Sequence, residues 1–152
     1  MKNFVLFFLL CCSYLTSSAQ GFGTRESINT GWFFKLGDGK YWGAEFFNHS
    51  KWRKLDVPHD WSIEMQANPN LASCTGYFPG GIGWYRRELQ ISAEAKGKKV
   101  YVYFEGVYNN SEVFINGKWI GKRPNGYVSF MYDLTPYVNF GGRNAVSYTH
   151  LT

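Results

Sequence analysis

Residues 57–64, VPHDWSIE, bring together the side chains that most often move protons in enzymes. His59 and Asp60 are adjacent, and Glu64 adds a second carboxyl group four residues after Asp60. Glycoside hydrolysis with retention needs two carboxyl groups about 5–5.5 Å apart. Pro58 argues against a helix that would bring the two carboxyl groups together, and four residues of extended chain span roughly 13 Å. The motif therefore does not predict a catalytic carboxylate pair.

The spacing of these residues also fits neither a Ser-His-Asp triad nor a metal site. A Ser-His-Asp triad needs His and Asp side chains that meet, but His59 and Asp60 are neighbours and point to opposite faces of an extended segment. A metal site would draw on His49, His59 and His150, whose separation gives neither helical nor hairpin spacing of ligands. We therefore expect no catalytic residue, no metal site and no cofactor in this chain.

A structural role suits the same residues. An Asp side chain in a turn accepts hydrogen bonds from nearby backbone amides, and Trp61 would fill the core. Asp60 thus has two interpretations at this point, as a turn residue or as a residue that contacts a ligand.

The elements that must hold this segment are β-strands. Residues 98–106, KKVYVYFEG, alternate apolar positions with a period of two. Residues 112–121, EVFINGKWIG, contain two apolar runs joined by an Asn-Gly pair, which predicts a tight hairpin. Residues 83–91 and 127–134 predict further strands, with Gly and Pro between them. Many short strands joined by such turns predict an all-β sandwich or jelly roll.

The length, the N-terminal segment and the cysteine count limit the class of protein. The 152 residues suit one domain, and residues 1–19 have the charged start, apolar run and small residues of a signal peptide cleaved after Ala19. We therefore expect a periplasmic or secreted protein with no membrane segment after cleavage. Cys74 is then the one cysteine left, so no disulfide framework is expected.

The net charge and the aromatic content limit the possible partners. The net charge is +5, but basic residues come at most in pairs, so no nucleic-acid partner is expected. Aromatic residues make up 20% of the chain. They suit the core of a β-rich fold, and the sharper alternative is that some of them stack on sugar rings.

Several stretches in order resemble one known family. NTGWFFKLGD, LDVPHDWSIE, GYFPGGIGWYRREL and VYVYFEGVYNNSEVFINGKWIGKRPNGYVSFMYDLTPYV resemble the N-terminal sugar-binding domain of glycoside hydrolase family 2, in particular secreted β-galactosidases of Bacteroidetes-type bacteria. The resemblance implies a jelly-roll β-sandwich of the galactose-binding-domain type. It also implies two partners in the same chain that are missing here, an immunoglobulin-like domain and a (β/α)8 barrel that carries the catalytic carboxyl groups.

The resemblance also suggests a substrate-binding residue. In the family, the loop after the hairpin carries an Asp or Asn that reaches the sugar, and Asn125 in KRPNGYVSFMYDL occupies the matching place. An amide both donates and accepts hydrogen bonds, as vicinal sugar hydroxyls require. The alternative is a turn, because Pro-Asn-Gly is a strong turn sequence. Asn125 and Asp60 are the two predicted substrate-binding residues.

The end of the chain departs from the family pattern. After Asn144 an apolar alternating strand is expected, but residues 145–152 read AVSYTHLT, which resembles a translated sequencing adaptor. We therefore expect a sugar-binding domain over residues 20–144 that is truncated before its last strand, followed by a non-native tail. The alternative is a genuine variant strand in which Val146 and Tyr148 alternate.

The expected function is that of a non-catalytic part of a larger enzyme. The parent would be a secreted family 2 glycosidase that hydrolyses terminal β-galactosides or oligosaccharides. A free-standing carbohydrate-binding module is one alternative, and the N-terminal domain of a β-glucuronidase or β-mannosidase is another, because these enzymes share the architecture.

Overall fold

The structure, a computed structural model, describes residues 23–152, and its regular elements are almost all β-strands. Its helices are single 3-10 turns, so no helix in the described range could reach across a membrane. The signal peptide predicted over residues 1–19 lies outside the described residues and stays a prediction. The strands are β1 (Trp32–Leu36), β2 (Arg53–Leu55), β3 (Ile82–Gln90), β4 (Tyr101–Phe104), β5 (Ser111–Ile115), β6 (Lys118–Arg123), β7 (Phe130–Asp133) and β8 (Arg143–Leu151), and the 3-10 turns are Ser62–Glu64, Ser73–Thr75 and Ala93–Ala95.

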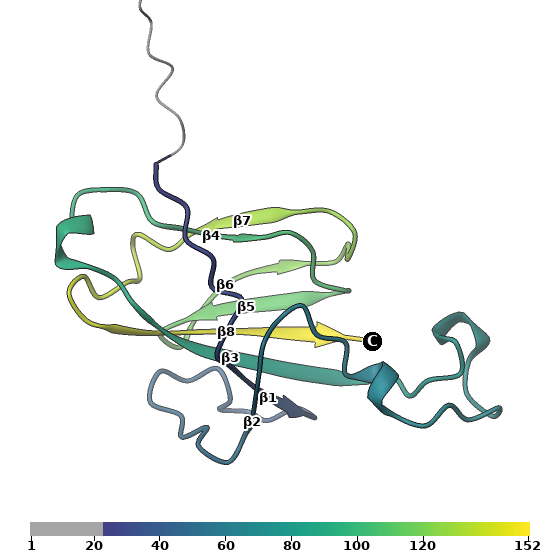
Figure 1. The fold of residues 1–152 in the computed structure, drawn as a ribbon. Coiled ribbons are helices and arrows are strands. Elements are labelled where there is room, and N and C mark those ends of the chain that lie inside the picture. The colour runs from purple at the N-terminus through teal and green to yellow at the C-terminus, as the bar shows by residue number, and fades with distance from the viewer. Residues whose placement is uncertain (1–22) are drawn as a thin grey trace, which may run out of the picture.

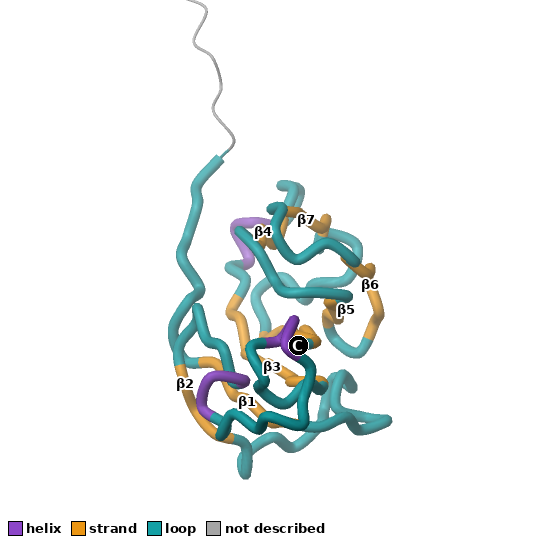
Figure 2. The backbone as a smooth tube through the Cα atoms, turned by 90° about the vertical axis from the view of Figure 1, so that its right-hand side faces the viewer, coloured by secondary structure: helices purple, strands orange, loops and turns teal. Residues whose placement is uncertain are grey.

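Two antiparallel sheets form the two layers of a sandwich (Figure 1 and Figure 2). The larger sheet has the strand order β2-β1-β3-β8-β5-β6, and β4 and β7 form the smaller sheet. This arrangement confirms the predicted all-β sandwich. The strands predicted at 83–91, 98–106, 112–121 and 127–134 are present as β3, β4, the β5–β6 hairpin and β7.

Large side chains that alternate along the strands fill the space between the sheets. Tyr85 on β3 and Tyr148 on β8 stand opposite each other in the register, and their rings stack with centroids 4.7 Å apart. Trp32 meets Tyr148 edge to face at 5.2 Å. Much of the aromatic content therefore serves the core, where large rings bury the most apolar surface. The other buried apolar residues of this core are Phe34, Trp61, Leu89, Val102, Val107, Val113, Ile115, Phe130, Leu134 and Val146.

The β5–β6 hairpin turns at Asn116 and Gly117, as the Asn-Gly pair predicts. Both residues have positive φ angles, 47° and 77°, as the mirror-image turns of tight hairpins require. The Asn116 side chain also ties the turn to β8, because it donates to Asn144 Oδ1 and accepts from the Ala145 amide, both at 2.8 Å. A turn predicted from two residues thus also aligns a distant strand.

The truncation of the sandwich stays a prediction, but the segment after Asn144 forms a regular strand. Residues 143–151 form β8, which lies between β3 and β5 in the middle of the larger sheet. The Val146 side chain is fully buried and that of Tyr148 is 6% exposed, so the alternation of these two residues places both in the core. The segment is therefore a strand in which Val146 and Tyr148 alternate, as the alternative interpretation expected. That residues 145–152 are foreign to the domain in origin stays a prediction, because strand pairing does not test it.

The connection between β1 and β2, residues 37–52, covers the outer face of the larger sheet. Arg86 on β3 points into this cover and is only 1% exposed. Its guanidinium donates to the carbonyl oxygens of Trp42 and Glu45, at 3.4 and 2.6 Å, and to Ser147 Oγ at 3.0 Å. Burial lowers the pKa of Arg86, and the carbonyl groups replace the water that the cation loses. Arg86 therefore fastens the connection to the sheet.

Shortening Val146 tests the role of β8 in the core. Val146→Ala removes two methyl groups from a fully buried position, and we expect a loss of about 2 kcal/mol in the free energy of unfolding. Urea denaturation followed by tryptophan fluorescence measures it. Val128→Ala is the matched control, because Val128 is 40% exposed in a loop and should change little. Equal effects of the two substitutions would contradict a core position for β8.

Candidate functional site

Several loops and the end of β8 meet at one end of the sandwich, which we call the loop end (Figure 1). The Asn109 amide donates to the Leu151 carbonyl at 3.0 Å, and the Asn110 amide donates to the Pro124 carbonyl at 3.1 Å. A reciprocal pair of backbone hydrogen bonds, 2.8 and 3.0 Å, joins Gly81 to the residue that follows β8. Both predicted substrate-binding residues lie here. The loop end comprises residues 57–65, 77–81, 105–110, 124–129 and 150–152.

Asp60 holds a turn at the loop end. Its Oδ1 accepts hydrogen bonds from the Ser62 amide at 3.0 Å and from Ser62 Oγ at 2.7 Å. The next side chain, Trp61, is 2% exposed and packs beside Gly83 of β3. These contacts confirm the structural role predicted for both residues. Asp60 itself is exposed, so its contact with a sugar stays a prediction.

Asn125 also makes a turn, and it stands among exposed aromatic rings. Its Oδ1 accepts a hydrogen bond from the Tyr127 amide at 2.8 Å. Tyr127 is 84% exposed, and its ring meets that of Tyr108 edge to face at 5.5 Å. Because the turn uses only one acceptor position of the amide, the same side chain can still donate to a ligand. The turn is thus confirmed, and the sugar contact stays a prediction.

A polar network braces the 57–65 loop. Arg53 pairs with Glu64 at 2.8 Å, and His59 Nε2 lies 3.1 Å from the same carboxylate. The other ring nitrogen of His59 lies 2.8 Å from the Tyr85 hydroxyl. Hydrogen bonds from Arg53 and then His59 lower the pKa of Glu64, whereas burial raises that of Tyr85. The two residues that suggested proton chemistry, His59 and Glu64, therefore hold a loop in place.

His150 belongs to this end of the molecule and not to a separate tail. It is 8% exposed at the end of β8, and its ring stacks on that of Tyr85 with centroids 6.2 Å apart. Its Nε2 lies 3.2 Å from Thr152 Oγ1. Burial lowers the pKa of His150, which favours the neutral imidazole. Nothing in the sequence links His150 with Arg53 or Tyr85, because three separate strands bring them together.

Several other polar and aromatic side chains make structural contacts. Trp84 is buried and donates from Nε1 to Asp38 at 2.8 Å. Asp133 accepts from the Thr135 amide at 2.9 Å and so caps the turn after β7. Hydrogen bonds from Thr135 and then Lys99 lower the pKa of Asp133 to about 2. Glu88 on β3 and Glu112 on β5 make ion pairs with Arg143 and Lys122, and Glu105, which follows β4, pairs with Arg25.

The loop end carries groups that suit a binding surface. A general acid needs a carboxyl group whose pKa is raised. Within residues 23–152, both carboxyl groups with a resolved pKa shift, Glu64 and Asp133, are shifted downward. No cluster in this range could hold a metal ion. Amide, carboxylate and tyrosine groups on an exposed rim can instead bind hydroxyl groups and stack on a ring.

Comparisons with known proteins agree with this arrangement. The family model described as "Glycosyl hydrolases family 2, sugar binding domain" matches residues 47–151. The β-galactosidase BoGH2A of Bacteroides ovatus is 46% identical over 126 residues, which cover 81% of this chain and 15% of that protein. A β-glucuronidase of Bacteroides fragilis is 39% identical over 94 residues, which cover 62% of this chain and 13% of that protein.

A solved structure extends the likeness to the fold. The crystal structure of a β-glycosidase from Bacteroides vulgatus superposes with a TM-score of 0.77 at 49% identity, over 84% of this chain and 17% of that one. The chain therefore spans a small part, 13–17%, of the length of these relatives. The match to residues 47–151 includes β8, which agrees with its place in the sheet.

The ion pair of Glu64 predicts that the stability of the fold depends on pH. Because the folded-state pKa of Glu64 is lowered, its contribution to stability is present above the unfolded-state pKa and is lost as pH falls through the folded-state value. Glu64 is partly exposed, so solvent screening keeps the contribution to about 0.5 kcal/mol. Glu64→Gln should be less stable than the unmodified chain near neutral pH, and the gap should close in acid.

Thermal melts at several pH values measure this gap. Glu94→Gln is the control, because Glu94 is exposed in a 3-10 turn and no ion pair of the described chain includes it. A gap for Glu64→Gln that does not depend on pH would mean that the carboxylate charge has no part in bracing the loop.

Proposed function

This chain belongs to glycosyl hydrolases family 2 through its sugar-binding domain, and we propose that it is the non-catalytic part of a longer β-galactosidase. The parent would be periplasmic or secreted, in keeping with the predicted signal peptide over residues 1–19. It would cut terminal β-galactosides with catalytic carboxyl groups on a (β/α)8 barrel that follows an immunoglobulin-like domain. The domain described here would shape the substrate pocket from its loop end.

The placement of Asn125 and Asp60 on the same end of the sandwich supports this proposal most directly. The two residues are 65 positions apart in the sequence, yet hydrogen bonds between loops and strand ends bring their segments to one surface. Side chains held by their own turns keep a fixed orientation, which lowers the entropy lost when a ligand binds. A sugar at the mouth of a neighbouring domain could then meet both.

A β-glucuronidase parent is the second candidate. The likeness to the Bacteroides fragilis β-glucuronidase favours it, since the same domain serves in both kinds of enzyme. Measuring the parent enzyme on paired aryl β-galactoside and aryl β-glucuronide substrates separates the two, because the candidates predict opposite preferences.

The chain alone should not hydrolyse glycosides. Asp60 accepts hydrogen bonds from Ser62 and Glu64 pairs with Arg53, so the two carboxyl groups of the 57–64 segment serve as loop contacts rather than as an acid–nucleophile pair. We expect no release of nitrophenol from an aryl β-galactoside by the purified 152-residue protein. Turnover that persists through purification and disappears when one of its own carboxylates is replaced would refute this.

Asn125 should contribute to catalysis in the full-length enzyme through substrate binding. Asn125→Ala leaves sugar hydroxyls without a partner, which costs about 1–3 kcal/mol and lowers kcat/KM roughly five- to 150-fold. The fold should change little, because Asn125 does not adopt a positive φ and alanine suits its backbone. Steady-state kinetics and melting temperatures measure the two effects separately.

Two further variants separate ligand contact from turn formation. Asn125→Gly keeps the turn without the side chain, whereas Asn125→Asp keeps the acceptor that the Tyr127 amide uses. Contact with the sugar requires the glycine variant to be slow and the aspartate variant to keep more activity. A glycine variant as active as the unmodified enzyme would leave Asn125 with a turn role only.

A further inference from the structure

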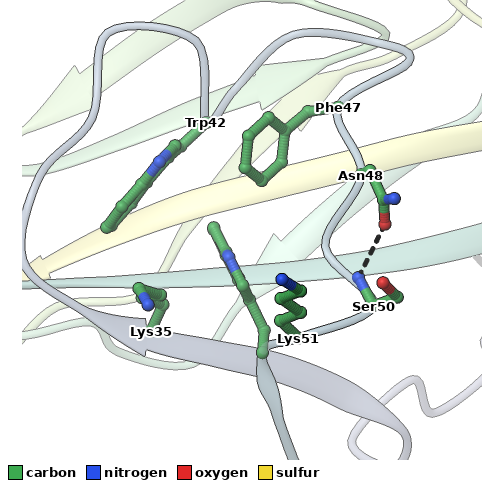
Figure 3. Close-up of a pocket in the computed structure, with 7 residues that line it drawn as sticks. Lys35, Trp42, Phe47, Asn48, Ser50 and Lys51 are labelled. Carbon is green, nitrogen blue, oxygen red and sulfur yellow. Dashed lines mark hydrogen bonds between the residues drawn. The ribbon is translucent and has the colours of Figure 1, made fainter.

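A pocket of about 390 Å³ lies on the outer face of the larger sheet, and none of its lining residues belongs to the loop end (Figure 3). It is built on β1 and on the connection that covers this face. Its volume is at the lower end of small-molecule sites and is large enough for one sugar ring. The lining residues are Lys35, Trp42, Phe47, Asn48, Ser50, Lys51 and Trp52.

Aromatic rings form one side of this outer pocket. Trp42 meets Trp52 edge to face with centroids 5.1 Å apart, and Phe47 lies 5.5 Å from Trp52. Trp52 is 7% exposed and is therefore held firmly, whereas Trp42 and Phe47 are partly exposed. Aromatic rings held in this way can stack on the C–H groups of a sugar, and their side chains lose little rotamer entropy when the sugar binds.

Cations form the opposite side. Figure 3 shows Lys35 and Lys51 across the pocket from Trp42 and Phe47. Both lysines are exposed, and neither takes part in an ion pair among the residues that the structure describes. Because neither ammonium group has a carboxylate partner there, this side of the pocket attracts an anion.

The rim adds a hydrogen-bonding group. Asn48 Oδ1 accepts from the Ser50 amide at 3.0 Å, which fixes the Asn48 side chain at one end of the pocket. Its amide N–H groups are donors of the kind that a sugar hydroxyl accepts. The pocket thus combines an apolar wall, a cationic wall and an oriented amide.

Buried contacts hold the pocket in shape. Arg86 donates to the carbonyl oxygens of Trp42 and Glu45 and to His49 Nδ1, the last at 3.2 Å, so the segment that carries the aromatic wall is tied to β3. The Phe33 ring packs on His49 with centroids 4.6 Å apart. A pocket anchored to a sheet in this way needs little reorganisation when a ligand enters.

From these features we propose that the outer pocket binds an anionic pyranose, as found in an acidic polysaccharide, with the ring on Trp42 and the acid group on the side that carries Lys35 and Lys51. The acid group is a carboxylate of a uronic acid or a sulfate ester, since both offer oxygens to ammonium groups. This site goes beyond the proposed function, because it lies on a different face from the loop end. It would hold the domain on a glycan chain while another part of the protein acts.

Titration of the 152-residue protein with small sugars tests the proposal. The probes are methyl β-glucuronide, galactose 6-sulfate and neutral methyl β-glucoside, and the readout is the NMR shift of the Trp42 and Trp52 indole N–H signals. We expect one or both acidic sugars to shift these signals with millimolar affinity and the neutral sugar to bind at least about fivefold more weakly. A preference for one acidic sugar identifies the source of the acid group.

Charge variants make the test specific. Lys35→Gln and Lys51→Gln should each weaken binding about fivefold, and the double variant should abolish the difference between acidic and neutral sugars. Lys54→Gln is the matched control, because Lys54 is exposed on β2 and does not line the pocket. The lysines are at the surface, so these variants should fold.

Three results would overturn the proposal. They are equal binding of neutral and acidic sugars, unchanged binding by the Lys35→Gln/Lys51→Gln double variant, and the absence of indole shifts at tens of millimolar sugar. The readout is independent of glycoside hydrolysis, so the outer pocket can fail while the proposed function stands, and the reverse holds as well.

Discussion

Strand β8 joins the two halves of the larger sheet. On one side it pairs with β3 along all nine of its residues, and on the other side it pairs with β5. Without these hydrogen bonds β2, β1 and β3 would separate from the β5–β6 hairpin, and the rings of Tyr85 and Tyr148 would lose their stacking. The start of β8 is fixed by Asn144, whose buried amide donates to two carbonyl groups and accepts two hydrogen bonds. A buried amide satisfied in this way tolerates one register only.

Because β3 and β8 lie in the middle of the larger sheet, both of its faces are covered, and the side chains buried on the two faces differ. The inward face carries the aromatic core, and the outward face carries a buried cation. Arg86 has no carboxylate partner in the described chain, so backbone carbonyl groups solvate it and must stay where they are. Moving the connection would leave a charge buried without partners, at a cost well above that of an exposed ion pair. The outer pocket therefore derives its rigidity from β3 although loop residues line it.

Local sequence patterns predicted the local structure well. The Asn-Gly pair specifies its hairpin because few other residues tolerate positive φ there. Asp60 and Asp133 accept amides two residues ahead, as short carboxylates in turns do. The strand β8 was only the alternative interpretation, because the likeness of AVSYTHLT to a translated adaptor outweighed the strand-like alternation of Val146 and Tyr148. The Arg53–His59–Tyr85 network and the outer pocket were not predicted either, since the network joins separate strands and the loop that lines the pocket is held by contacts to Arg86 on β3.

The turn contacts keep the loop end in one conformation without a ligand. Asn125 and Asp60 satisfy their own backbones, so neither loop needs a ligand to keep its conformation. The framework beneath them, from Trp61 to the Tyr85 ring, is buried and does not depend on what stands at the rim. Substituting an exposed rim residue then changes hydroxyl recognition while the sheet register stays the same. This separation suits a domain that occurs both in a relative named as a β-galactosidase and in one named as a β-glucuronidase.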